Sequence, residues 1–280
     1  MKITYISKGG TVEMGGGSSC IANLTKVSGL GLPSIEYEEK QYAGQSGITT
    51  TGRRDLPRTI TLSGDLNGGQ REIMKMLRSF YYAGELYCQS GSICRKIACK
   101  CTNLDDIEKH HNCGINGFTV QFQADSPYFC DYYDTTLALS GYKNHVTESF
   151  TLPCVFTEKL QQGDCDNTGD IICYPIINIS AKHAPAANEA TITLSNNTTG
   201  AQIVLHHTME CDETVTIDLP ARQIVSNIKG DITHKTADNI NLSDFYLEVG
   251  NNALAFATTD KSQPLAAMVT YNNKYIMGAV

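Results

Sequence analysis

The stretch TGRRDLPRTITLSGDL, Thr51–Leu66, decides how the first half of the chain is interpreted. Its first residues are basic and turn-prone, and they predict a loop that ends at Leu56-Pro57. Proline fixes its own φ and disfavours helix at the residue before it. We therefore expect the loop to end sharply and a strand to begin at Arg58.

The strand that follows has two different faces. Ile60 and Leu62 fall on one face, and Thr59, Thr61 and Ser63 fall on the other, because successive side chains of a strand alternate. One face is therefore expected to be buried and the other to remain polar.

Composition limits the possible functions. The chain has 280 residues, which is long enough for two domains with separate cores, and a formal net charge of −7. Residues 1–135 carry 14 Lys+Arg against 14 Asp+Glu, whereas residues 136–280 carry 8 against 15. Neither half has the positive charge typical of a nucleic-acid binder. No apolar run approaches the roughly 18 residues of a transmembrane helix, so we expect no membrane partner.

A single helix is predicted over Gln70–Ala83. Ile73, Leu77, Phe80 and Tyr81 are spaced i, i+4, i+7 and i+8 and form one apolar stripe, which we expect to pack over a sheet. The remaining pattern of the first half is that of strands, and it closes at Phe129. We expect a first domain over residues 1–135.

The second domain is expected over residues 136–280, with 136–170 as a linker and the first short strands. From Ile171 onward, short strands alternate with turns, a pattern typical of an antiparallel sandwich or jelly roll. The expected strands are Ile176–Ser180, Ala190–Ser195, Ala201–His207, Thr214–Leu219, Phe245–Val249, Ala253–Ala257, Met268–Tyr271 and Tyr275–Met277.

A catalytic constellation is not found in the sequence. It contains no G-x-S-x-G elbow, no Walker loop and no His-Glu-x-x-His motif. We therefore predict no catalytic residues, no enzyme activity and no cofactor.

Cysteine and histidine residues cluster in one segment and are weak candidates for a metal site. Zinc takes such ligands, but the spacing lacks paired C-x2-C motifs. Buried structural thiols are the favoured interpretation, with a zinc site or a disulfide left open. The candidates are Cys94, Cys99, Cys101, His110 and Cys113.

Carbohydrate binding is the alternative function, as a module of a tail or cell-surface adhesion protein. Sandwich domains often bind glycans, but Trp, the usual stacking residue, is absent from the chain. Tyrosine could replace it, although no tyrosine cluster stands out in residues 171–280.

Several segments, taken in order, resemble siphophage-type distal tail proteins. In the first half these are GLGLPSIEYEEKQYAGQSG, GRRDLPRTITLSGDL, REIMKMLRSFYY and GFTVQFQADSPYF. In the second half they are PIINIS, NNTTG, ETVTIDLPARQIV and SDFYLEVGNNALAF. The chain departs from the family in having Phe129 where Trp is frequent, and in its Cys-rich segment 88–113.

The resemblance implies a mainly β protein with two domains. The first would be a tail-tube-like β-sandwich or split barrel with one flanking helix, and the second a galectin-like antiparallel β-sandwich. Copies would form a hexameric ring that joins the tail tube protein to the tail-tip hub and offers a platform to receptor-binding or baseplate proteins. DNA would pass through the ring as cargo only. The protein would belong to the tail tip of the virion of a phage or prophage, assembled in the bacterial cytoplasm.

The arginines of the opening stretch have two possible roles. They could hold phosphate or contact another subunit, and an ordinary exposed loop is the third alternative. The phosphate role lacks a Walker lysine and a following helix N-terminus. We therefore predict a subunit interface in which Arg53, Arg54 and Arg58 pair with carboxylates of the adjacent copy, with Thr59 and Thr61 beside them.

Overall fold

The computed structural model describes residues 1–16, 20, 22–44, 46–66, 69–105, 108–110, 115–144, 157–160, 162–181, 190–259 and 265–279. The chain forms two compact units, which are described separately: unit 1 is Met1–Tyr132 with Lys274–Val280, and unit 2 is Tyr133–Asn273. From the sequence, Lys274–Val280 was expected in the second domain. In the structure this segment belongs to unit 1. None of the described helices is long and apolar enough to cross a membrane.

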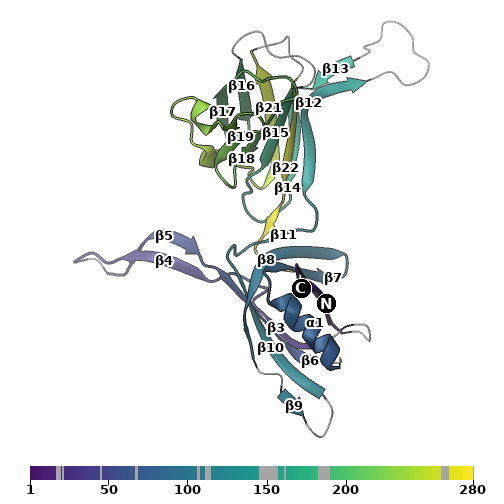
Figure 1. The fold of residues 1–280 in the computed structure, drawn as a ribbon. Coiled ribbons are helices and arrows are strands. Elements are labelled where there is room, and N and C mark those ends of the chain that lie inside the picture. Colours follow the sequence, from purple (N-terminus) through teal and green to yellow (C-terminus); the bar gives the residue numbers. More distant parts are fainter. Residues whose placement is uncertain are drawn as a thin grey trace. The chain divides into compact units, whose positions relative to one another are not determined.

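Unit 1 is built mainly from one sheet that closes on itself (Figure 1). The sheet order is β23-β11-β8-β7-β1-β2-β3-β6-β10-β9, and an additional pairing of β8 with β10 closes the barrel. The strands are β1 (Lys2–Ser7), β2 (Gly10–Gly15), β3 (Ala22–Ser28), β6 (Arg58–Leu66), β7 (Gly84–Ser90), β8 (Ile93–Leu104), β9 (Glu108–His110), β10 (Ile115–Ala124), β11 (Phe129–Asp131) and β23 (Lys274–Tyr275).

The weakest junction of this barrel lies between β2 and β3, which share one parallel pair, Met14 and Ala22. The single helix of unit 1, α1 (Gln70–Phe80), packs against β1 and β2. It contributes Phe80 to an aromatic cluster with Tyr5 and Phe122, whose ring centroids lie 4.8 to 5.5 Å apart. Such pairs add to the stability that area burial alone provides.

The helix exists where the sequence predicts it, but it ends at Phe80 and its buried face is rotated from the predicted stripe. Ile73 and Phe80 pack against the core as predicted. The residues that face the core are Met76, Ser79 and Phe80, whereas Leu77 is 36% and Tyr81 83% exposed. Ser79 is buried because its hydroxyl donates to the Gly10 carbonyl at 2.8 Å. The predicted stripe is therefore wrong in Leu77 and Tyr81, because a satisfied polar residue takes a place on the buried face.

Unit 2 consists of two antiparallel sheets that enclose one apolar core. The orders are β13-β12-β22-β15-β18-β19-β20 and β14-β21-β16-β17. The strands are β12 (Thr135–Asn144), β13 (Thr157–Leu160), β14 (Gln162–Asn167), β15 (Ile176–Ala181), β16 (Thr191–Asn196), β17 (Ala201–His206), β18 (Thr214–Asp218), β19 (Gln223–Ser226), β20 (Gly230–Asp231), β21 (Gly250–Thr258) and β22 (Leu265–Tyr271). Strict alternation of buried residues along β15 and β16 produces the two-layer arrangement.

Two strand predictions for the second half need correction. Phe245–Val249 is not a strand: it follows the short 3-10 helix η2 (Leu242–Asp244), and only Leu247 forms an isolated bridge, with Cys173. Phe245 and Leu247 are buried in alternation, as in a strand, but the segment forms no continuous ladder of hydrogen bonds with a neighbouring strand. A second 3-10 helix, η1 (Thr233–Lys235), lies earlier in the unit.

The second correction concerns the strand expected at the C-terminal end of the chain. It is β23, and it pairs with β11 of unit 1 instead of joining the sandwich. The predicted fold class is otherwise confirmed: a barrel with one flanking helix, followed by an antiparallel sandwich.

Candidate functional site

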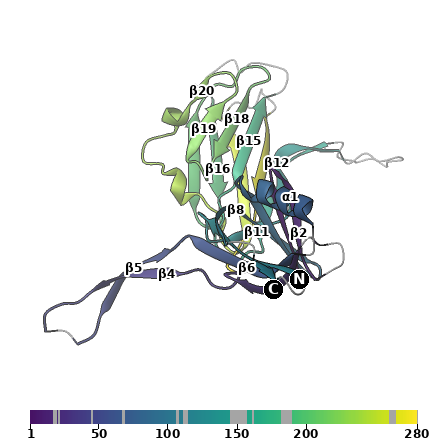
Figure 2. The same ribbon diagram turned by 60° about the horizontal axis from the view of Figure 1, so that its bottom comes forward.

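The basic start of the opening stretch is a strand, not a loop. Arg53 and Arg54 lie in β5 (Thr49–Asp55), which pairs antiparallel with β4 (Ile35–Lys40). Pro57 separates β5 from β6, as the sequence predicts. We call the hairpin Ile35–Asp55 the arm; it projects from the barrel of unit 1 in both views (Figures 1 and 2).

The arm has no layer packed on it among the described residues. Its strands form a separate two-stranded sheet, every residue of β4 after Ile35 is exposed, and so are both arginines of β5. An isolated two-stranded hairpin is at best marginally stable in water. The arm is therefore suited to contact with another molecule.

The base of the arm is anchored to the barrel. The Tyr128 hydroxyl donates a short hydrogen bond to Asp55, and Arg53 lies 3.1 Å from the same carboxylate. These contacts, the Tyr128 bond first, hold the pKa of Asp55 below its usual range. The Leu56 N–H donates to the Ser34 carbonyl at 2.8 Å and closes the base.

Arg58 belongs to the interior of unit 1. It is 3% exposed, and its guanidinium donates to four backbone carbonyls: Pro127 at 2.7 Å, Gly29 at 2.7 Å, Gly31 at 2.5 Å and Ile276 at 2.6 Å. The predicted pairing of Arg58 with a carboxylate of another subunit is therefore corrected. Its donors are committed inside the unit, where they join three distant segments.

Backbone geometry beside Arg58 depends on glycine. Gly29 has a φ of +87°, and a Cβ at this position would lie 2.1 Å from the Thr59 carbonyl oxygen. Only glycine fits there, and its carbonyl is thereby presented to Arg58. The Phe129 ring, 4.9 Å from the guanidinium carbon, covers the cation.

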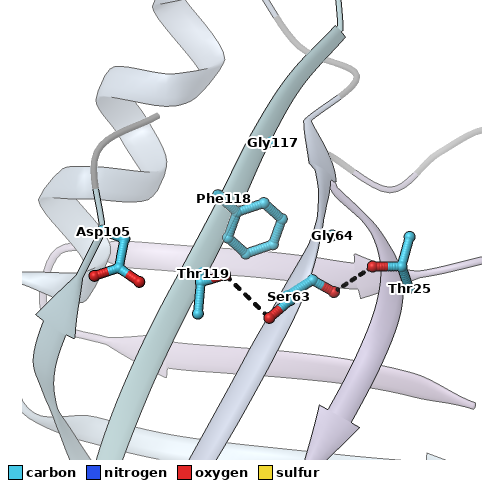
Figure 3. A pocket seen from close by; sticks show the side chains of 7 residues that line it. All are labelled: Thr25, Ser63, Gly64, Asp105, Gly117, Phe118 and Thr119. Atoms are coloured by element: carbon cyan, nitrogen blue, oxygen red, sulfur yellow. Dashed lines mark hydrogen bonds between the residues drawn. The ribbon is translucent and has the colours of Figure 1, made fainter. Parts of the chain in front are cut away.

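Thr59 and Thr61 lie on the outer face of β6, as the alternation predicts, with Ile60 and Leu62 buried on the other. A hollow of about 250 Å³ lies farther along this face. Figure 3 shows the side chains that line it. Hydroxyl groups link across it, with Thr119 donating to Ser63 Oγ at 3.0 Å. Its lining is Thr25, Ser63, Gly64, Asp105, Gly117, Phe118 and Thr119. With one carboxylate and no cation, it does not favour phosphate.

The five predicted interface residues therefore separate into three places. Arg53 and Arg54 lie in the arm, Arg58 inside the barrel, and Thr59 and Thr61 on the outer sheet face. Sequence reasoning missed the exposed carboxylates of β4, although the acidic run EYEEK beside the basic stretch was a readable signal of cross-strand pairing.

The cysteine cluster falls only partly within the described residues. Cys99 is buried, which raises the pKa of its thiol to about 12 and disfavours the thiolate that zinc binds. Cys94 and Cys101 are half-buried. No three potential metal ligands converge in the described part of the chain. Cys113 and the His110 side chain lie outside it.

A buried polar network occurs in unit 2. Glu213 accepts from His207 Nε2 at 2.8 Å, from Ser226 Oγ in a short bond, and from the Glu210 N–H at 2.6 Å. Lys235 Nζ lies 3.1 Å from His207 Nδ1, which requires that nitrogen to accept and the ring to be neutral. The serine contacts the carboxylate, not the histidine, and is buried, so the network lacks a nucleophile–base pair.

This network makes the stability of unit 2 dependent on pH. Burial lowers the pKa of His207 from its ordinary value of 6.5. Burial alone would raise the pKa of Glu213, but its hydrogen bonds, the one from Ser226 first, bring it below 4.5. Below pH 6.5 the unfolded chain therefore binds a proton that folded His207 resists, and below pH 4.5 the same holds for Glu213.

We expect the free energy of unfolding of unit 2 to be level above pH 7 and to fall below pH 6.5. The slope from His207 should approach about 1.4 kcal/mol per pH unit. Urea unfolding from pH 8 to 5 measures it. His207→Gln should remove this slope, and the exposed neighbour provides the control, since His206→Gln should retain it. Equal slopes in the two variants would contradict the assignment.

The comparisons with known proteins agree with this architecture. Residues 168–275 match the family model of the siphovirus-type tail component, C-terminal domain. This match confirms, for that part of the chain, the resemblance to siphophage-type distal tail proteins. No curated protein matches the chain.

Solved structures show the same fold over nearly the whole chain. One is the Dit protein of phage SPP1, described as a paradigm of the hub adsorption apparatus in phages that infect Gram-positive bacteria. It aligns with a TM-score of 0.65 and 14% identity, covering 97% of this chain and 98% of that chain. Another is the phage P2 baseplate in its activated conformation with Ca, with a TM-score of 0.54, 12% identity and coverage of 99% and 98%.

Proposed function

We propose that this chain, with its tail-component match and its fold shared with phage baseplate proteins, is a structural distal tail protein of a phage or prophage. Copies form a hexameric ring that joins the tail tube to the tail-tip hub. The ring carries the adsorption apparatus on its outside and leaves a central channel for DNA. The chain acts without enzyme activity or cofactor, in the virion at the tail tip.

The arm is the observation that carries this proposal. It exposes both faces and both arginines, and nothing described in its own chain covers it. A protruding element that docks on a different surface of the next copy produces a heterologous contact, and such contacts close into rings when the rotation permits. In such a ring, the neighbouring copy is the partner that covers each arm.

The chemistry of the outer face of the barrel is consistent with the wall of a DNA channel. Along β6 and β10 it presents hydroxyl and amide groups, and the neighbouring inward residues form the core. A wall of this chemistry lets DNA pass without strong attraction, because phosphate binding depends on cations. The residues concerned are Thr59, Thr61, Ser63, Thr119, Gln121 and Gln123.

The glycan-binding alternative has less support in unit 2. Tyr174 and Tyr246 pack against each other with ring centroids 6.3 Å apart, and Tyr271 is 6% exposed. A stacking platform needs exposed aromatic faces, and these three tyrosines do not provide them. Among the described tyrosine side chains of unit 2 only Tyr133 is largely exposed, at 77%, so no cluster of exposed rings is present there.

Charge reversal in the arm tests the proposed ring. We expect Arg53→Glu with Arg54→Glu to weaken assembly about tenfold or more. The change removes the Arg53–Asp55 ion pair at the base of the arm and places new carboxylates beside Asp55 and Glu36, so the arm is no longer held in its docking position. The folded monomer should remain, since neither residue contributes to the core. Light scattering measures the mass, and Thr51→Ala, an exposed change in the same strand, is the control. A variant ring as stable as the wild type would refute the role of these arginines.

A further inference from the structure

Two exposed apolar surfaces of similar character can be compared among the described residues of unit 1, and one of them is on α1. Met74 is 62%, Leu77 36% and Tyr81 83% exposed. Arg71, Met74, Arg78 and Tyr81 are spaced i, i+3, i+7 and i+10, so they share one side of the helix. We call this surface, with Lys75 beside it, the helix face. It combines apolar side chains with three cations, and apart from the contact of the Tyr81 ring with Tyr82 no described residue is seen to cover it.

The other exposed apolar surface is the outer part of the arm, residues 36–50, which we call the arm tip. Tyr37 is 51%, Tyr42 54% and Ile48 62% exposed. The exposed carboxylates of the arm are Glu36, Glu38 and Glu39, and its exposed cations are Lys40, Arg53 and Arg54. Arg53 is paired with Asp55 at the base of the arm, so the excess of acid is confined to the arm tip. Glu36 faces Arg54 across the strands, which leaves the other two carboxylates without an opposing cation in the ladder.

The two surfaces are complementary in both respects. Each has about three large apolar side chains to bury, and the net charges are opposite: the helix has three cations and one carboxylate, Glu72. Burying exposed apolar groups against each other stabilises a contact, and opposite charges at its rim select the partner and the register. A single chain does not bring the surfaces together, because the arm points away from the barrel (Figure 2).

We propose that the arm tip of one copy docks on the helix face of the neighbouring copy. This inference rests on the proposed ring and specifies its contact: Tyr42 and Ile48 meet Met74 and Tyr81, and the β4 carboxylates meet Arg71 and Lys75. The contact is heterologous, since each copy gives its arm and receives another on its helix.

Reciprocal charge reversal tests the pairing. Arg71→Glu with Lys75→Glu should weaken self-association about tenfold or more, and so should Glu38→Lys with Glu39→Lys. The helix should persist, because a carboxylate in its first turn is favourable, and Arg78 is kept at its last turn. Mixing the two variant chains, or combining all four changes, should restore assembly to within about threefold of the wild type.

A site-specific cross-link identifies the surface directly. A photoreactive phenylalanine analogue at Tyr42 should join the full-length chain to a peptide from α1 of another copy, detected by mass spectrometry after isotope labelling of one population. The same probe at Ile228, an exposed residue of unit 2, should give no such product.

The outcomes separate this contact from the ring itself. A ring that forms with Arg71→Glu and Lys75→Glu, or cross-links from Tyr42 to other segments, would overturn the docking and leave the ring standing. The protein can also be tested for binding to duplex DNA and to anionic vesicles. If Arg71→Glu with Lys75→Glu abolishes such binding but leaves self-association intact, the helix face binds nucleic acid or lipid, and the docking is overturned. A protein that stays monomeric even with tube and hub proteins would overturn both.

Discussion

Replacing Arg58 with alanine should destabilise unit 1 by about 3 kcal/mol or more, because it removes four hydrogen bonds from a buried, charged guanidinium. The four acceptors are those of Gly29, Gly31, Pro127 and Ile276, at 2.5 to 2.7 Å. No other described donor is positioned to replace a guanidinium that reaches four oxygens at once. Arg58 is thus one of the contacts that hold the C-terminal segment on unit 1, together with the pairing of β23 with β11.

Hydrogen exchange measured by mass spectrometry resolves the effect by unit. Amides of β6 and β10 should exchange about 100-fold faster in the variant, whereas those of β15 in unit 2 should be unchanged. Thr59→Ala, on the exposed side of the same strand, is the matched control and should change stability by less than about 0.5 kcal/mol. Arg58→Lys should lie between the two, since an ammonium cannot reach all four acceptors. Unchanged exchange in Arg58→Ala would contradict the structural role.

Removing the arm should abolish assembly and leave the folded chain intact. Glu36 and Arg54 are partners across the strands, so an Asn-Gly turn in place of residues 37–53 closes a two-residue hairpin. The excised residues are absent from the core of unit 1, so the free energy of unfolding should change by less than about 1 kcal/mol. Assembly should be lost completely, because each copy loses the element that it gives to its neighbour.

Light scattering and thermal unfolding together check this result. A monomer with the melting temperature of the parent chain is expected. A shortened chain that still forms the ring would show that the arm is dispensable, and a chain that unfolds would show that the arm supports unit 1. A useful control is Tyr42→Ser, which keeps the backbone of the arm and removes one apolar group, and should give an intermediate loss.

Local sequence patterns predicted those elements whose determinants are local. The alternation from Arg58 to Leu66 predicted β6 with the correct buried face, and Pro57 predicted its start. The apolar spacing after residue 70 predicted α1. The buried side of the helix was right in Ile73 and Phe80 and wrong in Leu77 and Tyr81. Ser79 lies on the buried side, and its hydroxyl is satisfied by Gly10, a contact between residues far apart in the chain.

Long-range pairings account for the failures. Arg53 and Arg54 seemed part of a loop because their strand partners, Tyr37 and Glu36, lie across a hairpin of low apolar content. The role of Arg58 could not be predicted, because its acceptors are backbone carbonyls and no side-chain pattern in the sequence marks them. One of these acceptors, Ile276, lies near the other end of the sequence. Lys274–Val280 returns to unit 1 through contacts that are equally distant in sequence, the pairing of β23 with β11 and the bond from Arg95 to the Met277 carbonyl.

The candidate site was predictable to a similar extent. The basic stretch was correctly singled out as exposed at Arg53 and Arg54, but its acidic partner strand was not. The exposed apolar side chains of α1 could not be recognised from the sequence, because this requires knowing which residues of the helix are buried.

Electron microscopy of the purified full-length chain tests the central claim most directly. The account predicts closed rings of six copies with a central hole, formed by the chain alone or with tail tube and hub proteins. Single particles of monomer size under all these conditions would contradict it.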